Sequence, residues 1–392
     1  MGPPDVGEAG ASASLPDELC RASRWLRDAA LPLWSSAGFD AVRGAFHEQL
    51  DFSLTPLVDR PSRLMVQARQ ISVFCSAALS GRFAAGEEPA LTAAQNMIDR
   101  YESVDGLPGW VFSRREDGSL DPLRDLYAHA FVLFGLSWAI RLAPRRSFLD
   151  AIERTVSFIE ANMRDAEHGG YWDSLPLMDA LRRQNPHMHL FEAFIALHEA
   201  TGESRFLVAG EKLRELMVSQ FLAREGGALR EYFSQDWTVH PAQGAGSVEP
   251  GHLFEWSWLL TRYETFSGKD QSNPIGRLMA MALRHGLDKR TGRIIDEITE
   301  DGRPVRTSSR SWPHAEALKA LSTVKSELGG GDSSAMAAIL HRLMTVYCPP
   351  FLNGGWQDQM DNEDHPLRPD IPASTFYHIY FSITCAEDYL AH

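Results

Sequence analysis

Gly169-Gly170-Tyr171-Trp172-Asp173 is a glycine-led turn followed by strand-like residues, and the same pattern recurs along the whole chain of 392 residues. The recurring turns begin at Gly44, Gly109, Gly169, Gly226, Gly292 and Gly354, so successive turns are 57 to 66 residues apart. A near-constant period of this kind indicates a repeat architecture, in which each unit buries its apolar face against its neighbours.

A strongly apolar segment follows each turn after about 20 to 25 residues. The segment 127–134 is apolar nearly all round, which is typical of a helix with neighbours on every side. We expect six such inner helices, beginning near Arg69, Tyr127, His189, His252, Trp312 and Tyr377. Amphipathic segments alternate with them and predict outer helices at about residues 15–34, 87–103, 145–163, 203–221, 272–288 and 332–347.

This alternation predicts an all-α fold, an (α/α)6 barrel of six inner and six outer helices with short β segments in the loops at one end. No alternation of helices with strands of four to eight residues competes with it. Because no Pro/Ser-rich linker interrupts the period, we expect one domain over residues 15–392. The Gly-, Pro- and Ala-rich residues 1–14 are expected to form a disordered lead-in.

Composition and charge exclude several classes of function. A formal charge of −14 disfavours nucleic acids and anionic membrane surfaces, which attract basic patches. No apolar run approaches the roughly 18 residues of a membrane-spanning helix. The four cysteines lack metal-binding spacing and the N-terminus lacks signal-peptide features, so we expect a cytoplasmic protein. No glycine-rich phosphate-binding motif indicates a nucleotide reactant.

Polar side chains gather where the inner helices are expected to start. In such a barrel the connections from outer to inner helices lie at one end, so these starts surround one cavity. They carry Arg69, Asp125, Tyr127, His129, His187, His189, Glu192, His252, Glu255, Trp312, Glu316, Tyr377 and His378. A barrel with a purely structural role has no reason to place a polar or aromatic group at the equivalent position six times.

Structural roles stay open for several of these residues. His129 lies among apolar residues and fits a core histidine, and His187 fits a helix cap. The two His-x-x-Glu pairs fit ordinary contacts within a helix. Trp312 fits either core packing or a platform on which a sugar stacks.

Two other kinds of site compete with histidine chemistry. Imidazoles and carboxylates suit a transition metal, but the di-iron helix motif has the order Glu-x-x-His, whereas this chain has His-x-x-Glu. Glycoside hydrolysis needs two carboxylates, for which Asp125, Glu255 and Glu316 are candidates. Histidine, with an unperturbed pKa of about 6.5, suits reversible proton transfer at neutral pH better. We therefore favour proton transfer without a metal.

Six motifs together resemble the N-acylglucosamine 2-epimerase superfamily of sugar epimerases and aldose–ketose isomerases, and the resemblance covers nearly the whole chain. The motifs are Val66-Gln67-Ala68-Arg69-Gln70, Asp125-Leu126-Tyr127-Ala128-His129-Ala130-Phe131, Asn185-Pro186-His187-Met188-His189-Leu190-Phe191-Glu192-Ala193, Glu249-Pro250-Gly251-His252-Leu253-Phe254-Glu255-Trp256, Arg310-Ser311-Trp312-Pro313-His314-Ala315-Glu316 and Ser374-Thr375-Phe376-Tyr377-His378. The resemblance implies an (α/α)6 barrel that acts on a small monosaccharide and needs no metal or other cofactor.

The resemblance also implies roles for individual residues. The implied catalytic residues are His252, His378, Glu255, Arg69 and His189. The candidate substrate contacts are Glu192, Trp312, Tyr127, Asp125, Glu316 and Tyr377. Among these, His252 and His378 are the implied acid/base pair, while Arg69 and His189 contact the oxygens at the carbonyl end of the sugar. The glutamates of the two His-x-x-Glu pairs are implied to orient or assist the histidines.

These roles predict a reaction of the open-chain aldose. One histidine removes the C2 proton, and Arg69 with a histidine N–H stabilises the enediolate oxygens. Return of the proton to C1 gives a ketose, whereas return to the opposite face of C2 gives the 2-epimer. The ending Ser374-Thr375-Phe376-Tyr377-His378 is most similar to the bacterial mannose isomerase branch, which favours interconversion of free D-mannose and D-fructose.

Two alternatives stay open: a 2-epimerase acting on mannose and glucose or on an N-acylhexosamine, and a non-catalytic sugar-binding or regulatory protein. A phosphorylated sugar is less attractive because the chain is acidic and shows no dedicated basic cluster, although Arg182, Arg183 and Arg310 are candidates for one in space. We expect a monomer or a homodimer.

Overall fold

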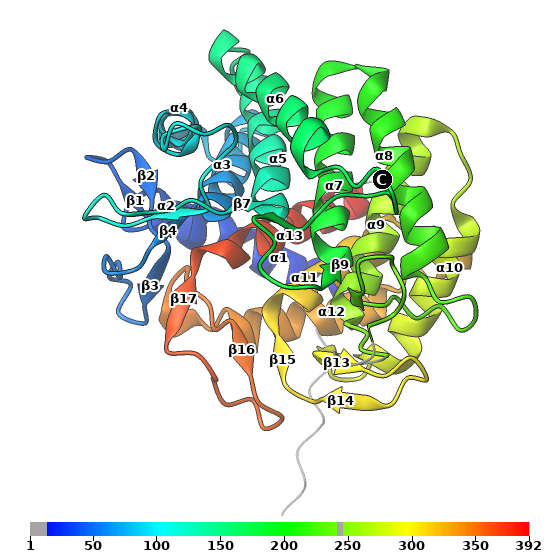
Figure 1. Cartoon of the computed structure of the whole chain (residues 1–392). Coiled ribbons are helices and arrows are strands. Elements are labelled where there is room, and N and C mark those ends of the chain that lie inside the picture. Colours follow the sequence, from blue (N-terminus) through cyan, green and yellow to red (C-terminus); the bar gives the residue numbers. More distant parts are fainter. Residues whose placement is uncertain (1–13, 241–245, 392) are drawn as a thin grey trace, which may run out of the picture.

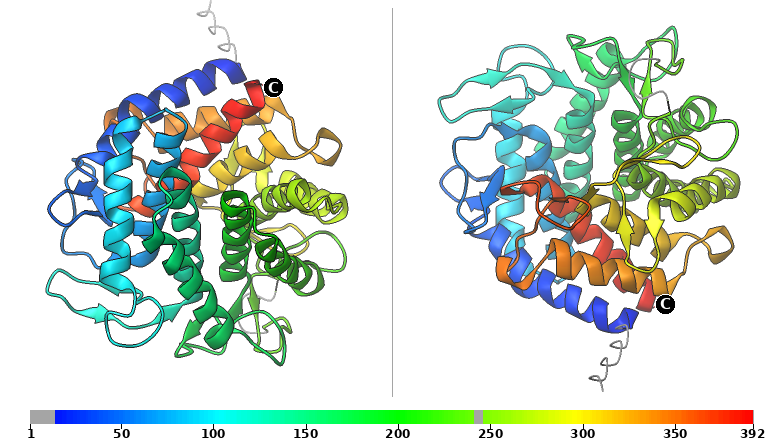
Figure 2. Two further views of the ribbon diagram at one scale, coloured as in Figure 1. Left: turned by 90° about the horizontal axis from the view of Figure 1, so that it is seen from above. Right: turned by 90° about the horizontal axis from the view of Figure 1, so that it is seen from below.

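Paired helices surround one central axis in the computed structural model of the chain (Figure 1, Figure 2). The structure describes residues 14–240 and 246–391. Within these residues six inner helices form the barrel wall: α3 (Leu64–Leu79), α5 (Leu126–Leu142), α7 (Gln184–Thr201), α9 (Pro250–Ser267), α11 (Ser311–Thr323) and α13 (Phe376–Ala391). Each inner helix packs against the next, and α13 packs against α3, so the inner ring closes.

The outer ring in the same described ranges consists of α1 (Leu15–Trp25), α4 (Glu87–Tyr101), α6 (Arg146–Phe158), α8 (Ser204–Leu216), α10 (Ser272–Met281) and α12 (Ser333–Arg342). All but α4 continue into a π-helical segment, and these segments are Leu26–Ala30, Ile159–Met163, Met217–Phe221, Ala282–Gly286 and Leu343–Tyr347. A short helix, α2 (Leu31–Ser35), follows the first of them. Each outer helix packs on the inner helix that precedes it, and α1 packs on α13. The predicted (α/α)6 barrel is therefore confirmed.

One inner helix begins about one and a half turns earlier than predicted, because α7 begins at Gln184 rather than near His189. Helix α3 begins at Leu64, where the sequence pattern indicates a helix over about residues 63–79. Polar residues and Pro186 fit the first turn of α7, where the backbone N–H groups have no intrahelical acceptor. As a result, Arg69 and His189 project from inside the barrel wall rather than from its rim.

Short antiparallel strands join neighbouring repeats at the end where the inner helices begin. Residues just before an inner helix pair with the turn of the next repeat in β4 (Ser62–Arg63) with β5 (Ser113–Arg114), β7 (Arg124–Asp125) with β8 (Ser174–Leu175), β9 (Arg182–Arg183) with β10 (Tyr232–Phe233), β15 (Ser309–Arg310) with β16 (Gln359–Met360), and β17 (Asp370–Pro372) with β3 (Gln49–Asp51). The last of these pairs links the last repeat to the first.

The remaining strand pairs lie within single repeats. They are β1 (Phe39–Asp40) with β2 (Ala45–Phe46), β5 with β6 (Leu120–Asp121), β11 (Leu287–Asp288) with β12 (Arg293–Ile294), and β13 (Glu297–Ile298) with β14 (Pro304–Arg306). The predicted β segments are thus present at one end of the barrel.

The recurring glycines are required by the backbone of the turns. All six have positive φ, from +60° at Gly44 to +99° at Gly354, a region that other L-residues rarely adopt. A Cβ on Gly292 would lie 2.3 Å from the carbonyl oxygen of Ala338 in α12. The turn therefore packs directly on the outer helix, which explains why the sequence period is marked by glycine.

The predicted lead-in over residues 1–14 lies outside the described residues except for Ser14, whose hydroxyl caps α1 by accepting a hydrogen bond from the backbone N–H of Asp17. The assignment of residues 15–392 to one domain stays a prediction. Within the described part of the chain, every helix is too short or too polar to cross a membrane.

Candidate active site

A cavity of about 470 Å³ opens where the inner helices begin, and all six of these helices contribute to its wall. Seven of the predicted site residues line it, namely Arg69, Tyr127, His189, His252, Glu255, Trp312 and His378. Asn185, Glu249, Arg306, Arg310, Asp358 and Arg368 also line it. The convergence of the repeats on one cavity agrees with the expectation from the sequence.

His252 stands in the first turn of α9 and is held by a carboxylate from the preceding loop. Its Nδ1 lies 2.9 Å from Oε1 of Glu231, which is itself buried. Gln184 donates an Nε2–H hydrogen bond of 2.9 Å to the other oxygen of that carboxylate. The sequence pattern paired His252 with Glu255, but Glu255 points toward His189 on the neighbouring inner helix. The residue that orients His252 is therefore Glu231.

His378 is held by a glutamate of the neighbouring inner helix. Its Nδ1 lies 2.6 Å from Oε1 of Glu316, and the other oxygen of Glu316 lies 2.8 Å from Nζ of Lys319. Glu316 was expected to contact substrate, but it lies beneath the cavity wall with no exposed surface. Its position makes it the partner of His378 rather than a sugar ligand.

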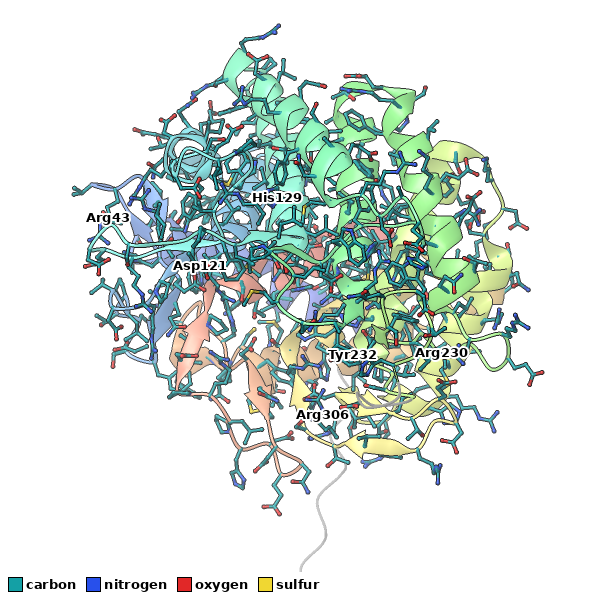
Figure 3. All side chains as sticks on the ribbon, viewed as in Figure 1. Arg43, Asp121, His129, Arg230, Tyr232 and Arg306 are labelled. Atoms are coloured by element: carbon teal, nitrogen blue, oxygen red, sulfur yellow. The ribbon has the colours of Figure 1, made fainter. Side chains whose placement is uncertain are left out.

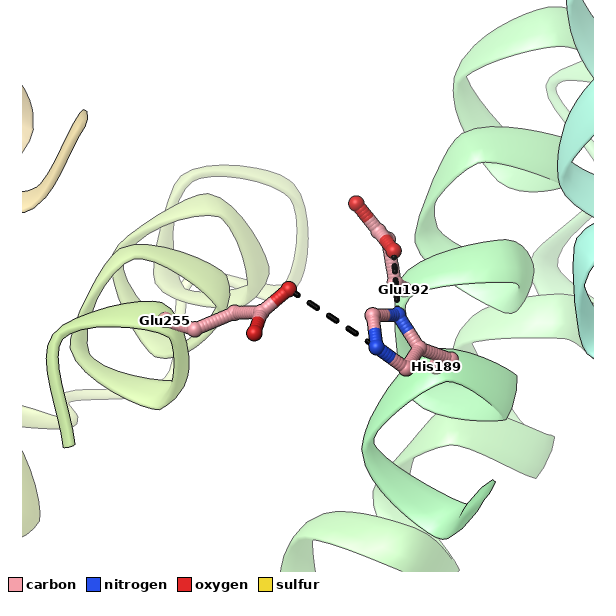
Figure 4. A group of neighbouring side chains, drawn as sticks. All are labelled: His189, Glu192 and Glu255. Carbon is pink, nitrogen blue, oxygen red and sulfur yellow. Dashed lines mark hydrogen bonds and ion pairs between the residues drawn. The ribbon is translucent and has the colours of Figure 1, made fainter. Parts of the chain in front are cut away.

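His189 and Glu255 face each other from the neighbouring inner helices α7 and α9 (Figure 4). Nδ1 of His189 is 2.9 Å from Glu192, and its Nε2 is 3.9 Å from Oε1 of Glu255. Glu192 also accepts a hydrogen bond from the Tyr377 hydroxyl, so both residues lie behind the cavity wall. Oε1 of Glu255 has no hydrogen-bond partner in the described part of the chain. Because Glu255 lines the cavity, this oxygen is left for a ligand to satisfy.

Arg69 presents a buried guanidinium to the cavity without a carboxylate partner among the described residues. It donates hydrogen bonds to the Tyr127 hydroxyl at 2.5 Å and to the backbone oxygen of Ser374 at 3.0 Å. Its Cζ lies 4.1 Å from the centre of the Phe131 ring. A buried cation held by neutral groups keeps its full charge for an anion that forms in the cavity.

Trp312 lies beside both histidines of the acid/base pair. Its ring centre is 5.0 Å from that of His252 and 5.6 Å from that of His378. The side chain is half-buried and lines the cavity, so its ring is placed to contact a sugar between the two imidazoles. Asp125, in contrast, is outside the cavity lining and caps α5 by accepting a hydrogen bond of 2.7 Å from the backbone N–H of Ala128.

Three other histidines have a structural role outside the cavity, because each joins a glycine-led turn to the inner helix that follows it. In His129, His187 and His314, Nδ1 lies 2.7 to 3.0 Å from the carbonyl oxygen four residues earlier. Their Nε2 atoms accept backbone N–H bonds of 3.0 to 3.1 Å from the glycine-led turns. Burial lowers the pKa of all three, to about 4, 3 and 3 respectively, so they are neutral. His129 lies within α5 (Figure 3) and has the structural role that the sequence left open.

The two histidines of the predicted acid/base pair differ in charge. Burial, opposed only in part by Glu316, lowers the pKa of His378 to about 3. Burial also disfavours the charged form of His252, but the carboxylate of Glu231 outweighs it and the pKa rises to about 9. Near neutral pH, His252 therefore carries a proton that His378 lacks.

Burial controls the remaining cavity groups as well. It lowers the pKa of His189 to about 4 in spite of Glu192, so His189 is neutral. Burial, reinforced by repulsion from Glu316, raises the pKa of Glu255 well above its usual value. The raised pKa favours the protonated form of Glu255, which can donate a hydrogen bond into the cavity.

In the described ranges, two groups of side chains bring metal-ligand atoms within 4.8 Å of one another: His189 with Glu192 and Glu255, and Glu255 with Glu316 and His378. Most of these atoms already contact protein groups. Nδ1 of His189 contacts Glu192, and Glu316 contacts both His378 and the ammonium group of Lys319. The prediction that no metal takes part stays a prediction.

Comparison with known proteins identifies the family. The sequence profile of N-acylglucosamine 2-epimerase (GlcNAc 2-epimerase) matches residues 44–382. The chain belongs to this family. A mannose-6-phosphate isomerase from Rhizobium meliloti (strain 1021) is 33% identical over 381 residues, covering 93% of this chain and 96% of the relative. A D-mannose isomerase from Thermobifida fusca is 26% identical over 298 residues, covering 69% and 72%.

Solved structures share the barrel of this epimerase family. The cellobiose 2-epimerase from Spirochaeta thermophila DSM 6192 has a TM-score of 0.84 at 23% identity, covering 96% of this chain and 98% of its own. A D-mannose isomerase has a TM-score of 0.82 at 19% identity, covering 97% and 100%. As a member of the GlcNAc 2-epimerase family, the protein is an enzyme of the isomerase and epimerase class with a small sugar as substrate.

Sequence reasoning missed two important residues of this GlcNAc 2-epimerase family site, Glu231 and Lys319. A signal for Glu231 exists, because an acidic residue stands four or five positions after the glycine in five of the six turns, at Glu48, Asp173, Glu231, Asp296 and Asp358. Lys319 left no such signal. It lies one helical turn after Glu316 on α11 and is completely buried.

Proposed function

We propose that this enzyme is an aldose–ketose isomerase that interconverts D-mannose and D-fructose through an enediolate. The observation that supports the proposal is the presence of His252 and His378, both beside Trp312, in one cavity. Each uses Nδ1 to contact a buried glutamate, which leaves Nε2 to exchange a proton with a substrate. Paired imidazoles of this kind suit reversible proton transfer next to a carbonyl.

The difference in charge assigns the two roles. His378 is neutral and acts as the base that removes the proton from C2 of the open-chain aldose. His252 is protonated and acts as the acid that donates a proton to the sugar oxygen O1 as the carbonyl becomes an enediol oxygen. An acid and a base with well-separated pKa values are both in their working forms over a wide range of pH.

Arg69 and Glu255 supply donors for the charge that develops between these steps. The guanidinium of Arg69, held by neutral oxygens, faces the cavity and stabilises the enediolate oxygens. In its protonated form, which the raised pKa favours, Glu255 donates a hydrogen bond to a sugar oxygen. Neither group needs to move when the charge forms, because both are held in the barrel wall.

Isomerisation is completed by two further proton transfers, in which O2 of the sugar loses a proton and C1 gains one. The proton on O2 leaves to the imidazole of His252 as the O2 carbonyl forms. His378 then returns its proton to C1, which gives the ketose and restores both histidines. No electrons leave the sugar, so the reaction needs no oxidant or reductant.

A sugar 2-epimerase is the second candidate, because the same enediolate becomes the 2-epimer if a proton returns to the opposite face of C2. The likeness to a cellobiose 2-epimerase and the presence of a second imidazole, His252, both favour it. Incubation with D-mannose in deuterated water, followed by NMR, separates the candidates. Fructose labelled at C1 supports the isomerase, and glucose labelled at C2 without fructose supports the epimerase. Absence of fructose, of a 2-epimer and of deuterium label with every hexose tested refutes both.

A phosphorylated hexose is a third candidate, favoured by the relative that is named a mannose-6-phosphate isomerase and by arginines on the cavity wall. Of the arginines considered from sequence, Arg182 and Arg183 bind Asp165 and Asp173 in the loops, whereas Arg310 lines the cavity. Arg306 (Figure 3) and Arg368 join it there, paired with Glu297 and Asp370. These guanidinium groups suit recognition of a phosphate ester.

The comparison of D-mannose with D-mannose 6-phosphate tests this candidate. If the ester is the substrate, Arg306→Gln and Arg368→Gln raise KM for the ester about tenfold each and leave KM for mannose unchanged. Arg303→Gln is the matched control, because Arg303 is exposed and pairs only with nearby Asp301. Turnover of mannose without turnover of the ester refutes the phosphorylated substrate and leaves the isomerase proposal intact.

A further inference from the structure

Lys319 places a buried positive charge directly behind the wall of the cavity. It lies on α11 with no exposed surface, and its Nζ is 2.8 Å from Oε2 of Glu316. This contact is an ion pair without hydrogen-bond alignment. Nζ also lies 3.7 Å from the centre of the Trp258 ring on α9. Lys319 is outside the cavity lining, so it has no direct contact with a sugar.

The burial of this ammonium group carries a large desolvation cost, which an apolar side chain of similar length would avoid. The neighbouring carboxylates of Glu316 and Glu192 act on Lys319 and raise its pKa against burial, so it stays charged. Only Glu316 lies between this ammonium group and His378, the proposed base. A charge kept buried at such a cost so close to the base indicates a role beyond packing.

The two histidines of the site have matching glutamates but different groups behind them. Oε2 of Glu231, the partner of His252, accepts a hydrogen bond from the neutral amide of Gln184. Oε2 of Glu316, the partner of His378, faces the ammonium group of Lys319. The negative charge next to His378 is therefore balanced by a cation, whereas the charge next to His252 is not.

We propose that Lys319 is a positioning residue that reserves His378 as the base, because it balances the charge of Glu316 and so removes the reason for His378 to hold a proton. The inference rests on the proposed isomerase or epimerase chemistry. His252 takes the acid role by the same logic, since no Lys or Arg among the described residues pairs with Glu231. One lysine thus makes two similar His–Glu pairs unequal.

The other charged groups near the two imidazoles act in the same direction. Arg69 from α3 faces His378 and adds to the positive field of Lys319. Glu249, at the start of α9, adds to the negative field of Glu231 at His252. His189 from α7 also faces His252 but is neutral. Tyr377, beside His378, has a pKa raised well above its usual value by burial and so carries no charge.

The test is the pH dependence of kcat/KM for Lys319→Met. We expect the acid limb to move upward by at least about one pH unit, because the unbalanced carboxylate of Glu316 raises the pKa of His378. The alkaline limb, set by His252, stays in place. Lys319→Arg keeps the charge and is expected to restore the acid limb even where kcat is lower. A folded Lys319→Met enzyme with the wild-type acid limb overturns the proposal.

A second measurement uses the wild-type enzyme alone, in case the methionine variant does not fold. Diethyl pyrocarbonate reacts with neutral imidazoles, and peptide mapping by mass spectrometry identifies the modified residue. At pH 6 we expect modification of His378 and not of His252, with His252 becoming reactive only near pH 9. Modification of His252 first, or of both at one rate, overturns the proposal. This readout needs no turnover, so it is independent of the C2-exchange experiment that tests the proposed chemistry.

Discussion

Replacement of Glu231 by glutamine separates the charge of this residue from its shape. The carboxylate overcomes burial and raises the pKa of His252 from 6.5 to about 9. Glutamine keeps an oxygen near Nδ1 of His252 and a polar contact with Gln184, but it carries no charge. Burial, which lowers the pKa of His252, is then no longer opposed by the carboxylate of residue 231. We therefore expect the pKa of His252 to fall to 6.5 or below.

The size of the effect follows from the protonated fraction of His252. At pH 8 an acid with a pKa of about 9 is roughly 90% protonated, whereas one with a pKa of about 6.5 is roughly 3% protonated. We therefore expect kcat/KM of Glu231→Gln to fall about 30-fold at pH 8 and to recover most of this loss near pH 6. The alkaline limb of the pH profile moves down by about two units or more.

The assay is initial-rate fructose formation from mannose between pH 5 and pH 10, with circular dichroism to confirm the fold at each pH. Glu225→Gln is the matched control, because it removes the same charge from an exposed position of the same loop. Two results refute the reasoning: an alkaline limb that does not move in the folded variant, or a loss of activity that is the same at every pH. The second result would mean that Glu231 only fixes the orientation of the His252 imidazole.

Three further predictions concern Arg69, the structural histidine His314 and the mechanism without a metal. Arg69→Lys keeps a charge but loses the planar fork, and we expect kcat to fall about 100-fold with little change in KM, as measured by steady-state kinetics. His314→Ala leaves the N–H of Ile294 unpaired and removes one hydrogen bond from the carbonyl of Arg310, so urea unfolding should give a stability lower by about 1–3 kcal/mol with an unchanged pH profile. An unchanged unfolding midpoint would contradict this structural role. Exhaustive dialysis against EDTA should leave activity intact, and a loss that one divalent metal restores would remove the metal-free mechanism.

The barrel was predictable because each repeat carries the same local sequence signals. A glycine with positive φ is needed where a turn meets an outer helix, as at Gly292, and an apolar segment is needed wherever a helix has neighbours on all sides. These local requirements recur at a fixed period, and so they reveal the number and order of the helices. The position of His189 within α7 was less predictable, because the polar first turn of that helix carries no apolar signal.

The pairing of side chains in the site was harder to predict, because it depends on contacts between repeats. Spacing along one helix suggested that Glu255 orients His252, but the carboxylate comes from Glu231 in the preceding loop. His378 is likewise held by Glu316, which is 62 residues away in the sequence. Periodicity shows which face of a helix a residue occupies, whereas the choice of partner depends on how neighbouring helices pack.

The most direct test of the account follows the C2 hydrogen itself. D-Mannose deuterated at C2 is incubated in ordinary water with the wild-type enzyme and with His378→Asn, and loss of deuterium from C2 is measured by NMR. We expect the wild-type enzyme to break the C2–D bond with a primary isotope effect. The variant should do so at least about 100-fold more slowly, although its cavity is otherwise intact. Cleavage of the C2–D bond by the variant at the wild-type rate would contradict the assignment of His378 as the base.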